Sequence, residues 1–396
     1  MREIPLSVPN LDADIVDNLK ECVETGWIST GGRFIGEFEA AVADYVGVRG
    51  AVGCQSGTAG LHVALRILGV MPGDEVIVPT LTFIAAVNPV FYQGAEPIFM
   101  DCDPRFCVDP DKLEKFCAEE CRLTPRGLIN KNSGKRVAAL VVVHVFGNLA
   151  DMGRIMDIAN KYRIRVLEDA TEALGSFYGD GALKGKHAGV IGDIGVFSFN
   201  ANKIITTGGG GMIVANDADI LAQARYLTTT AKDDGLYFVH DSAGYNYRML
   251  NIQAAFGVSQ IKRIEEFVGI KTHNFNVYKE RLEAMGVVGL NILPFSENIR
   301  SNHWFYSFSV DEREFGMSRD ALMARLIDAG IQCRPVWRLC HKQKPYENAR
   351  SYMIRQAERF ERTVLNLPCS TNLSEDDVGY VCKKIADLRN DNIASA

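Results

Sequence analysis

The chain has 396 residues, of which 47% are hydrophobic and 23% charged, and this balance is typical of a globular protein with two domains. Its formal net charge of −6 gives no electrostatic reason to expect nucleic acid or an anionic membrane as a partner. The first residues lack the apolar core of a signal peptide, and the longest apolar run, 137–147, is too short to span a membrane. We therefore expect a cytoplasmic protein with neither nucleic acid nor membrane as a partner.

The ten cysteines form no CxxC pair, which favours free thiols in a reducing compartment. Cys102, Cys107, Cys117 and Cys121 lie close enough in sequence to raise the question of zinc. Their spacing matches no common structural zinc site, and part of the segment has a helical pattern. We expect no metal.

Up to about residue 250, short apolar segments alternate with helical patterns. Strands are expected at 50–53, 75–78, 97–100, 138–143, 164–167, 195–199 and 212–215. Helices are expected between them at 34–46, 58–68, 83–92, 110–121, 152–162 and 218–226. This alternation predicts an α/β domain, residues 1–250, with a mostly parallel seven-stranded sheet between helices. Ligands of such sheets bind at the carboxyl ends of the strands.

A second domain, smaller and of the α+β class, is expected over residues 251–396. It begins with a long helical pattern, 251–285, in which a break is expected near Gly269. A strand at 304–310, a helix at 319–329, a short strand at 332–334 and a helix at 375–388 follow.

The expected strand at 195–199 delivers Ser198 and then Lys203 into a turn that ends in four glycines, 208–211. Lysine is strongly hydrated, so a lysine among apolar residues is a candidate for a lowered pKa and a nucleophilic amine. The alternative is an ordinary surface lysine in a turn. The glycines are expected to allow tight backbone geometry beside the lysine.

Asp169 follows another expected strand, within Glu168-Asp169-Ala170. A lysine for an aldehyde and a carboxylate for a pyridine nitrogen are the two protein groups that pyridoxal phosphate requires. Lys203 and Asp169 together therefore predict that cofactor.

Gly57 and Thr58 lie between the first strand and a helix with an apolar face. Small residues at a helix start let a phosphate reach backbone N–H groups at the positive end of the helix dipole. An ordinary N-cap at Ser56 is the alternative. The segment is neither a Walker loop nor a dinucleotide-binding fingerprint.

Two further residues have a functional and a structural interpretation. Phe83, just after a strand, would stack on an aromatic cofactor or simply pack in the core. Asn246, within Gly244-Tyr245-Asn246-Tyr247-Arg248-Met249, would bind a ligand or stabilise a turn.

The order of these segments resembles that of the DegT-type sugar aminotransferases, a branch of the aspartate aminotransferase fold (fold-type I pyridoxal-phosphate enzymes). The resemblance runs from about Gly26 to Leu373. It rests on the segments 26–32, 56–59, 78–83, 168–170, 198–203 and 246–248, with His341, Gln343, Tyr346 and 367–368 further on.

The resemblance implies roles for these residues. Lys203 would bind the cofactor covalently and then move a proton between amino acid and cofactor, and Asp169 would keep the pyridine nitrogen protonated. Phe83 would stack on the ring. The phosphate would be held by Gly57, Thr58, Ser198 and, from the neighbouring subunit of a homodimer with a shared active site, Asn246.

Two features distinguish this chain within the resemblance. Where the family often has Gln or His three residues after the aspartate, this chain has Glu172, a second carboxylate expected near the cofactor. Members that dehydrate sugars carry His in place of the lysine. The intact Lys203 therefore favours transamination.

The resemblance implies transfer of an amino group from L-glutamate to a ketone of a nucleotide-linked deoxysugar. Substrate contacts are expected at Trp27, Thr30 and His341, and Arg334, Arg338 and Lys342 would meet a diphosphate. Each of these also has a bland interpretation, as an exposed charge or a core side chain. Residues 330–337 look most like members that aminate UDP-2-acetamido-2,6-dideoxy-4-hexuloses, which we take as the expected substrate. A GDP- or dTDP-linked keto-deoxyhexose, and a non-catalytic regulator of the same fold, are the alternatives.

Overall fold

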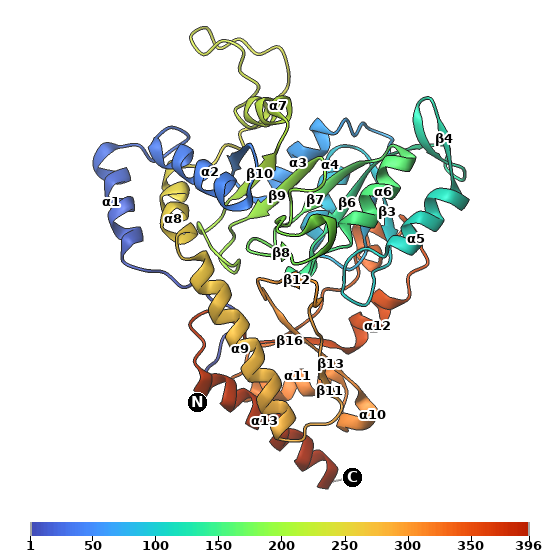
Figure 1. Cartoon of the computed structure of the whole chain (residues 1–396). Helices are drawn as coiled ribbons and strands as arrows, with labels where there is room; N and C mark the ends of the chain where they lie inside the picture. The colour runs from blue at the N-terminus through green and yellow to red at the C-terminus, as the bar shows by residue number, and fades with distance from the viewer. Residues whose placement is uncertain (1, 395–396) are drawn as a thin grey trace.

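A large sheet occupies the upper half of the computed structural model, which describes residues 2–394 (Figure 1). Its ten strands are β1 (Gly50–Cys54), β2 (Glu75–Pro79), β3 (Glu96–Met100), β4 (Cys121–Thr124), β5 (Gly127–Asn130), β6 (Arg136–Val143), β7 (Arg165–Asp169), β9 (Ile194–Ser198), β10 (Gly211–Ala215) and β15 (Arg350–Tyr352). The main path of the sheet runs β1-β10-β9-β7-β6-β2-β3-β15. From β9 to β15 all neighbours are parallel, while β10 is antiparallel to β9 and β1. The expected mostly parallel sheet is confirmed, and all seven expected strands belong to it.

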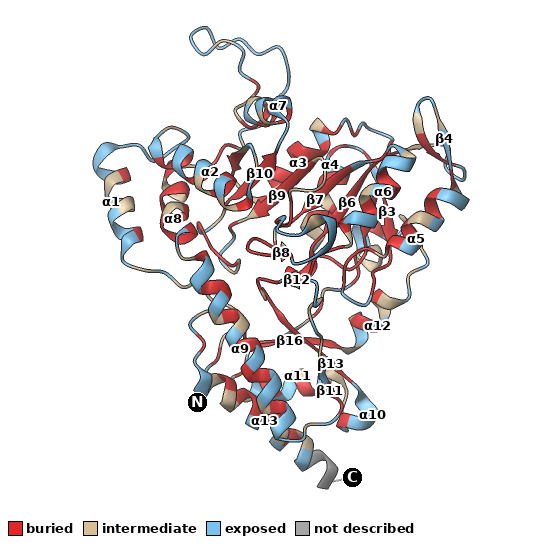
Figure 2. Cartoon of the chain, in the orientation of Figure 1, coloured by how far each residue is buried: buried red, intermediate tan, exposed pale blue. Residues whose placement is uncertain are grey.

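Helices cover both faces of this sheet, and their bounds are α1 (Asp14–Thr25), α2 (Arg33–Val46), α3 (Gly57–Ile67), α4 (Asn88–Tyr92), α5 (Pro110–Lys115), α6 (Met152–Tyr162), α7 (Ala218–Thr228) and α8 (Asn251–Ile261). Successive strand residues point to opposite faces. In β2, Val76 and Val78 pack into the same core as α3, α4 and α7, whereas Ile77 packs into the core of α2, α5, α6 and α8. The strands are thus buried on both sides, as their colour in Figure 2 shows.

The smaller part lies below and contains a four-stranded antiparallel sheet in the order β11-β13-β16-β14 (Figure 1). These strands are β11 (Leu290–Ile292), β13 (Tyr306–Val310), β14 (Arg334–Pro335) and β16 (Val364–Leu367). The helices here are α9 (Ile264–Ala284), α10 (Glu312–Phe315), α11 (Arg319–Asp328), α12 (Gln356–Thr363) and α13 (Glu375–Ala394). A further ribbon of two strands pairs β8 (Phe177–Tyr178) with β12 (Ile299–Arg300), one from each part.

Several segments cross between the two parts. β15 joins the large sheet beside β3, although it comes late in the chain. Near the other terminus, Ile4 forms a bridge with Ile331 of the smaller part. The division into two domains at residue 250 stays a prediction.

The prediction of one continuous helix at 83–92 was wrong, because the segment forms two separate helical pieces. The chain forms a short 3-10 turn, Ile84–Ala86, and then α4, with Phe83 in an extended conformation before both. Pro89 has no N–H to donate to the preceding turn, so a helix starts afresh at Asn88 with this proline in its first turn.

The helix expected at 110–121 is confirmed over residues 110–120, but its type changes along its length. α5 ends at Lys115, a π-helical turn follows over Phe116–Glu120, and β4 begins at Cys121. β4 and β5 form a hairpin that the sequence analysis missed.

The break in the long helical pattern lies earlier than expected. It separates α8 from α9 at Lys262 and Arg263, whereas Gly269 lies inside α9. Buried Phe267 and Val268 hold the helix against its neighbours, which outweighs the cost of about 1 kcal/mol for an exposed helical glycine.

All ten cysteines are buried, free thiols. Among residues 2–394 no three His, Cys, Asp or Glu side chains are grouped so that they could hold a metal ion. No helix within the same residues is both long and apolar enough to cross a membrane.

Candidate active site

A cavity of about 370 Å³ opens at the carboxyl ends of the central strands, between the large sheet and the smaller part. The large sheet contributes the segments that follow β1, β2, β7 and β9, and the smaller part contributes Trp304, Phe305 and Trp337. Because β1, β2, β7 and β9 all run in one direction, their carboxyl ends share an edge of the sheet. The cavity is therefore at the edge where the sequence analysis expected a ligand.

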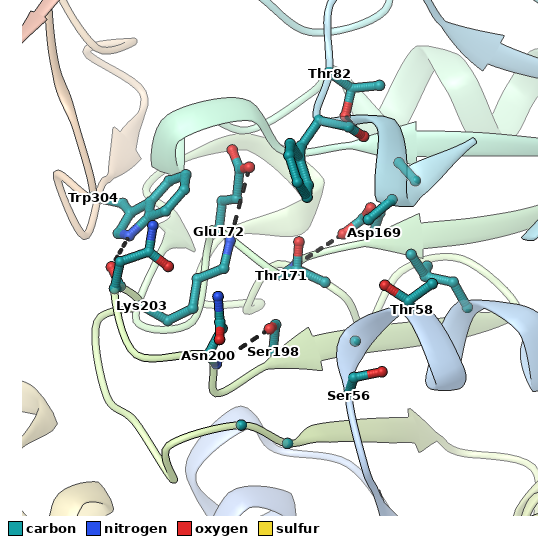
Figure 3. A pocket seen from close by; sticks show the side chains of 18 of the residues that line it. Ser56, Thr58, Thr82, Asp169, Thr171, Glu172, Ser198, Asn200, Lys203 and Trp304 are labelled. Atoms are coloured by element: carbon teal, nitrogen blue, oxygen red, sulfur yellow. Dashed lines mark hydrogen bonds and ion pairs between the residues drawn. The ribbon is translucent and has the colours of Figure 1, made fainter. Parts of the chain in front are cut away.

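Lys203 lies in the turn after β9, with its amine directed into the cavity (Figure 3). Its Nζ is 3.9 Å from a carboxylate oxygen of Glu172 and 3.9 Å from the ring centroid of Trp304. Burial lowers the pKa of the Lys203 amine, and the carboxylates of Glu172 and Asp169 oppose that shift. The lysine is thus a desolvated amine beside two acids, not an exposed surface cation.

Asp169 ends β7 and is also buried at the cavity wall. Its Oδ1 accepts a hydrogen bond from the N–H of Thr171 at 3.1 Å. Burial raises the pKa of the Asp169 carboxyl, while the bonds from Thr171 and the charge of Lys203 lower it. A cationic partner in the cavity would favour its ionised form.

A buried histidine lies directly behind this aspartate. The backbone N–H of His144 donates to the backbone oxygen of Asp169 at 3.1 Å. Its Nδ1 accepts from the N–H of Ala150 at 3.2 Å, so Nε2 carries the ring proton and donates it to Glu168 at 2.8 Å. Glu168 also accepts backbone N–H bonds from the loop that leads to β9, which makes it a structural anchor. Glu168 was predicted only as part of a motif, and His144 was not predicted as a site residue.

Glu172 is the second acid of the cavity. One oxygen faces Lys203, and the other accepts the N–H of Phe146 at 2.8 Å. Burial raises the pKa of the Glu172 carboxyl to about 7 in spite of the nearby lysine. Near neutral pH, Glu172 can therefore take up or release a proton beside the amine.

The start of α3 forms a cradle of small groups facing Ser198. The Oγ of Ser56 caps the helix by accepting from the N–H of Ala59 at 3.1 Å. The first-turn amides of Gly57 and Thr58 have no partner among the described residues. A Cβ on Gly57 would lie 3.0 Å from the Cβ of Ser198 and from Thr171, so the glycine keeps this space open. These are donors suited to an anion.

The glycines after Lys203 allow a close backbone approach to the same helix start. A Cβ on Gly211 would lie 2.5 Å from the backbone carbonyl of Ser56. Gly208 and Gly210 have φ angles of +74° and +146°, which side chains rarely adopt. Tight backbone geometry beside the lysine was the expectation, and the φ angles agree with it.

Aromatic side chains line the rest of the cavity. Phe83 is 54% exposed, so it is not the core side chain of its structural interpretation, and its ring centroid lies 6.4 Å from that of Trp337. Trp304 and Phe305 were missed because they lie in the smaller part, 100 or more residues from Lys203, in no motif, and Trp337 was included only as the end of the segment 330–337. Thr171, Asn200 and Asn202 were missed too, although each lies within three residues of a residue that was found.

The remaining predicted residues lie outside the walls of this cavity. Trp27 and Thr30 are exposed near the start of α2, and Asn246 and Arg334 are exposed elsewhere on the surface. His341 is half-buried, with its Nδ1 2.6 Å from the hydroxyl of Thr80. Of the predicted residues, the cavity brings together Gly57, Thr58, Phe83, Asp169, Glu172, Ser198 and Lys203.

The chemical types of the groups that line the cavity are those that pyridoxal phosphate requires. The cavity combines one desolvated lysine, one buried carboxylate on the neighbouring strand, an exposed ring and a helix start with free amides. In addition, Oδ1 of Asn202 is buried without a hydrogen-bond partner in the described structure, so the cavity wall retains an unused acceptor. Lys203 would hold the aldehyde carbon, Asp169 the ring nitrogen, and Gly57, Thr58 and Ser198 the phosphate.

Comparison with known proteins agrees with this chemistry. The sequence model of the DegT/DnrJ/EryC1/StrS aminotransferase family matches residues 9–386. A protein of Caulobacter vibrioides named GDP-perosamine synthase is 39% identical over 380 residues, covering 96% of each chain. EpsN of Bacillus subtilis, provisionally named a pyridoxal phosphate-dependent aminotransferase, is 33% identical over 393 residues, covering 98% of this chain and 96% of its own. Among solved structures, that of DesI with its TDP-sugar product is similar, with a TM-score of 0.86 and 29% identity over 98% of this chain and 93% of DesI.

Proposed function

Since the chain belongs to the DegT/DnrJ/EryC1/StrS aminotransferase family and is an enzyme of that family, we propose that it aminates a nucleotide-linked sugar. The proposed reaction transfers the amino group of L-glutamate to the 4-keto carbon of a GDP-linked 6-deoxyhexose, with pyridoxal phosphate as cofactor. The observation that carries this proposal is the single cavity in which Lys203, Asp169 and the start of α3 meet.

The GDP-linked substrate revises the preference drawn from sequence alone. Residues 330–337 favoured a UDP-linked acetamidosugar, with GDP- and dTDP-linked sugars as alternatives. The name of the Caulobacter vibrioides relative supports the GDP alternative, because its 39% identity extends over nearly all of both chains. The TDP-sugar product of DesI supports the wider class of nucleotide-linked sugars at lower identity.

The side chains of the cavity have different roles in the proposed reaction. When bound, pyridoxal phosphate supplies an aldehyde that accepts an amino group and a ring that withdraws electrons from the reacting carbon. The buried Lys203 amine can lose its proton more easily than an exposed lysine, so its Nζ can act as the base. Asp169, when ionised, would favour a positive charge on the ring nitrogen of the cofactor. The carboxyl of Glu172, with a pKa of about 7 and an oxygen 3.9 Å from Nζ, can take up or release a proton beside the amine.

We also propose that two copies of the chain share the site. Asn246 belongs to the predicted phosphate group, yet it lies on the exposed surface of its own chain. The nearby loop over α7 projects away from the molecule and exposes Leu236, Tyr237 and Phe238, each more than two thirds accessible (Figures 1 and 2). Such an apolar tip is suited to burial against a second copy. Mixing a Lys203→Ala protein with an Asn246→Ala protein should restore activity to mixed dimers; no restoration would contradict sharing.

The substrate is tested by single-turnover amination. Enzyme is first charged with amine by L-glutamate and freed of glutamate. It is then mixed with GDP-linked 4-keto-6-deoxyhexose, with the UDP-linked 4-keto acetamidosugar or with a dTDP-linked keto-deoxyhexose. The proposal predicts the fastest discharge with the GDP-linked sugar. A faster discharge with either other sugar would replace it.

A further inference from the structure

Trp304, which lies between α9 and β13, contacts the catalytic lysine segment at two points. The face of its ring lies 3.9 Å from Nζ of Lys203, measured to the ring centroid. Its indole N–H donates to the backbone oxygen of Asn202 at 2.7 Å. Both the amine and the backbone that carries it are thus held by one side chain from the smaller part (Figure 3).

The backbone of Trp304 is itself fixed by buried polar groups. Its N–H donates to Oδ1 of Asn302 at 3.0 Å. The amide nitrogen of the Asn302 side chain donates to the backbone oxygens of Glu172 and Leu174, both at 2.9 Å. One asparagine therefore ties the tryptophan to the segment that carries Glu172.

A buried lysine secures the same backbone from the other side. Lys271 on α9 is 3% exposed, and its Nζ donates to the backbone oxygen of Trp304 at 3.0 Å and to that of Cys369. Burying an ammonium is costly unless its hydrogen bonds are made, so this arrangement signals a tightly specified position. Between Asn302 and Trp304, His303 has a φ of +50°, a left-handed conformation that is uncommon for residues other than glycine.

We propose that Trp304 is a positioning residue for Lys203: its ring and its indole N–H hold the amine toward Glu172. This inference rests on the proposed role of Lys203 and adds to it the means by which the smaller part controls the amine. Asn302 and Lys271 act through Trp304.

The ring of Trp304 also affects the protonation of Lys203. The negative face of an indole ring attracts an ammonium and not a neutral amine, so the ring favours the protonated lysine. The other charged groups near the amine are Glu172 and Asp169 on the β7 side, and Lys271 on α9, which borders a small cavity shared with Lys203. Replacing the ring by an aliphatic group of apolar character removes its attraction and leaves these charges in place.

The test is competitive acylation of the full-length, cofactor-free protein over a range of pH. The extent of acetylation of the peptide that contains Lys203 gives the midpoint of its titration. In Trp304→Leu we expect this midpoint to fall by about 1.5 pH units, the size of a desolvated cation–π contact. In Trp304→Phe, which keeps a ring, we expect less than half of that fall. Trp337→Leu, a matched change in the same cavity away from Lys203, should leave the midpoint in place.

Hydrogen exchange tests the second contact without reference to titration. Trp304→Phe removes the donor to the Asn202 oxygen, so amides of the 200–203 turn should exchange several-fold faster than in the wild type, while Trp337→Leu leaves them unchanged. Should Trp304→Leu not fold, Trp304→Phe still decides the matter by this measurement. An unshifted midpoint in Trp304→Leu, an equal shift in Trp337→Leu, or unchanged exchange in Trp304→Phe would overturn the proposal. Since no cofactor is present, these outcomes do not depend on whether the protein is an aminotransferase.

Discussion

The two walls of the cavity differ in what they contribute. The large-sheet wall supplies the groups with chemistry, Lys203, Asp169 and Glu172, each at the end of a parallel strand or shortly after it. The wall from the smaller part supplies Trp304, Phe305 and Trp337, which have no titratable side chain. The first wall determines which bonds can change, and the second determines the shape of the cavity and the position of the lysine.

This difference predicts how each wall responds to substitution. Changes in the large-sheet wall should abolish steps of the reaction or binding of the cofactor. Changes in the other wall should move a titration or a local exchange rate, as argued for Trp304. The following predictions test the comparison from the largest expected effect to the smallest.

Lys203→Ala should have the largest effect. The substitution removes both the nucleophilic amine and the base, and general bases alone contribute about 10²–10⁴-fold. Turnover in a coupled glutamate assay should fall at least about 10⁴-fold, with an unchanged circular dichroism spectrum. Lys161→Ala, which alters an exposed lysine on α6, is the control and should retain wild-type turnover. Sustained turnover by the Lys203→Ala variant would show that the reaction does not require Lys203, against the role given to the large-sheet wall.

Asp169→Asn should bind pyridoxal phosphate but react roughly 100-fold more slowly, because a neutral amide would not stabilise a positive charge on the ring nitrogen of the cofactor. The amide oxygen can still accept the N–H of Thr171, which preserves the local fold. Stopped-flow measurement of the glutamate half-reaction gives the rate. A wild-type rate would show that another residue carries this role.

Gly57→Ala tests the anion cradle. The new Cβ would lie 3.0 Å from Ser198 and Thr171, in the space proposed for the phosphate. We expect the affinity for pyridoxal phosphate to fall about 10-fold, or about 1.4 kcal/mol, in equilibrium binding. Gly36→Ala, at an exposed helical glycine with open space around it, is the matched control. Equal affinities in both variants would place the phosphate elsewhere.

A separate measurement, the dependence of stability on pH, tests Glu172→Gln. Burial raises the pKa of Glu172 from 4.5 to about 7, so the folded protein binds its proton more tightly than the unfolded chain does. The stability from this group is fully present below pH 4.5 and is lost as the pH rises through about 7. From pH 5 to pH 8 the wild type should therefore lose on the order of 1–3 kcal/mol more unfolding free energy than Glu172→Gln. If urea titrations gave the two proteins the same change of unfolding free energy with pH, the raised pKa of Glu172 would be contradicted.

The same comparison explains how much could be predicted from the sequence. Lys203, Asp169 and Ser198 were predictable because each lies at or near the carboxyl end of an apolar strand. The carboxyl ends of parallel strands lie together at one edge of the sheet. Trp304 was not, since its place depends on buried Lys271 and Asn302, whose partners are backbone groups far along the chain. Periodicity also misled at Gly269, where packing outweighs a weak local preference, and at Pro89, where a missing N–H divides an apolar helical pattern.

The central claim is that Lys203 and its cavity hold pyridoxal phosphate for amino transfer. The most direct test is the visible absorbance of the purified protein, supplied with pyridoxal phosphate, before and after addition of L-glutamate. We predict a yellow absorption band that bleaches with glutamate, returns with the GDP-linked keto-sugar and is absent from Lys203→Ala. A protein that stays colourless with added pyridoxal phosphate would contradict the claim and favour a non-catalytic regulator of the same fold.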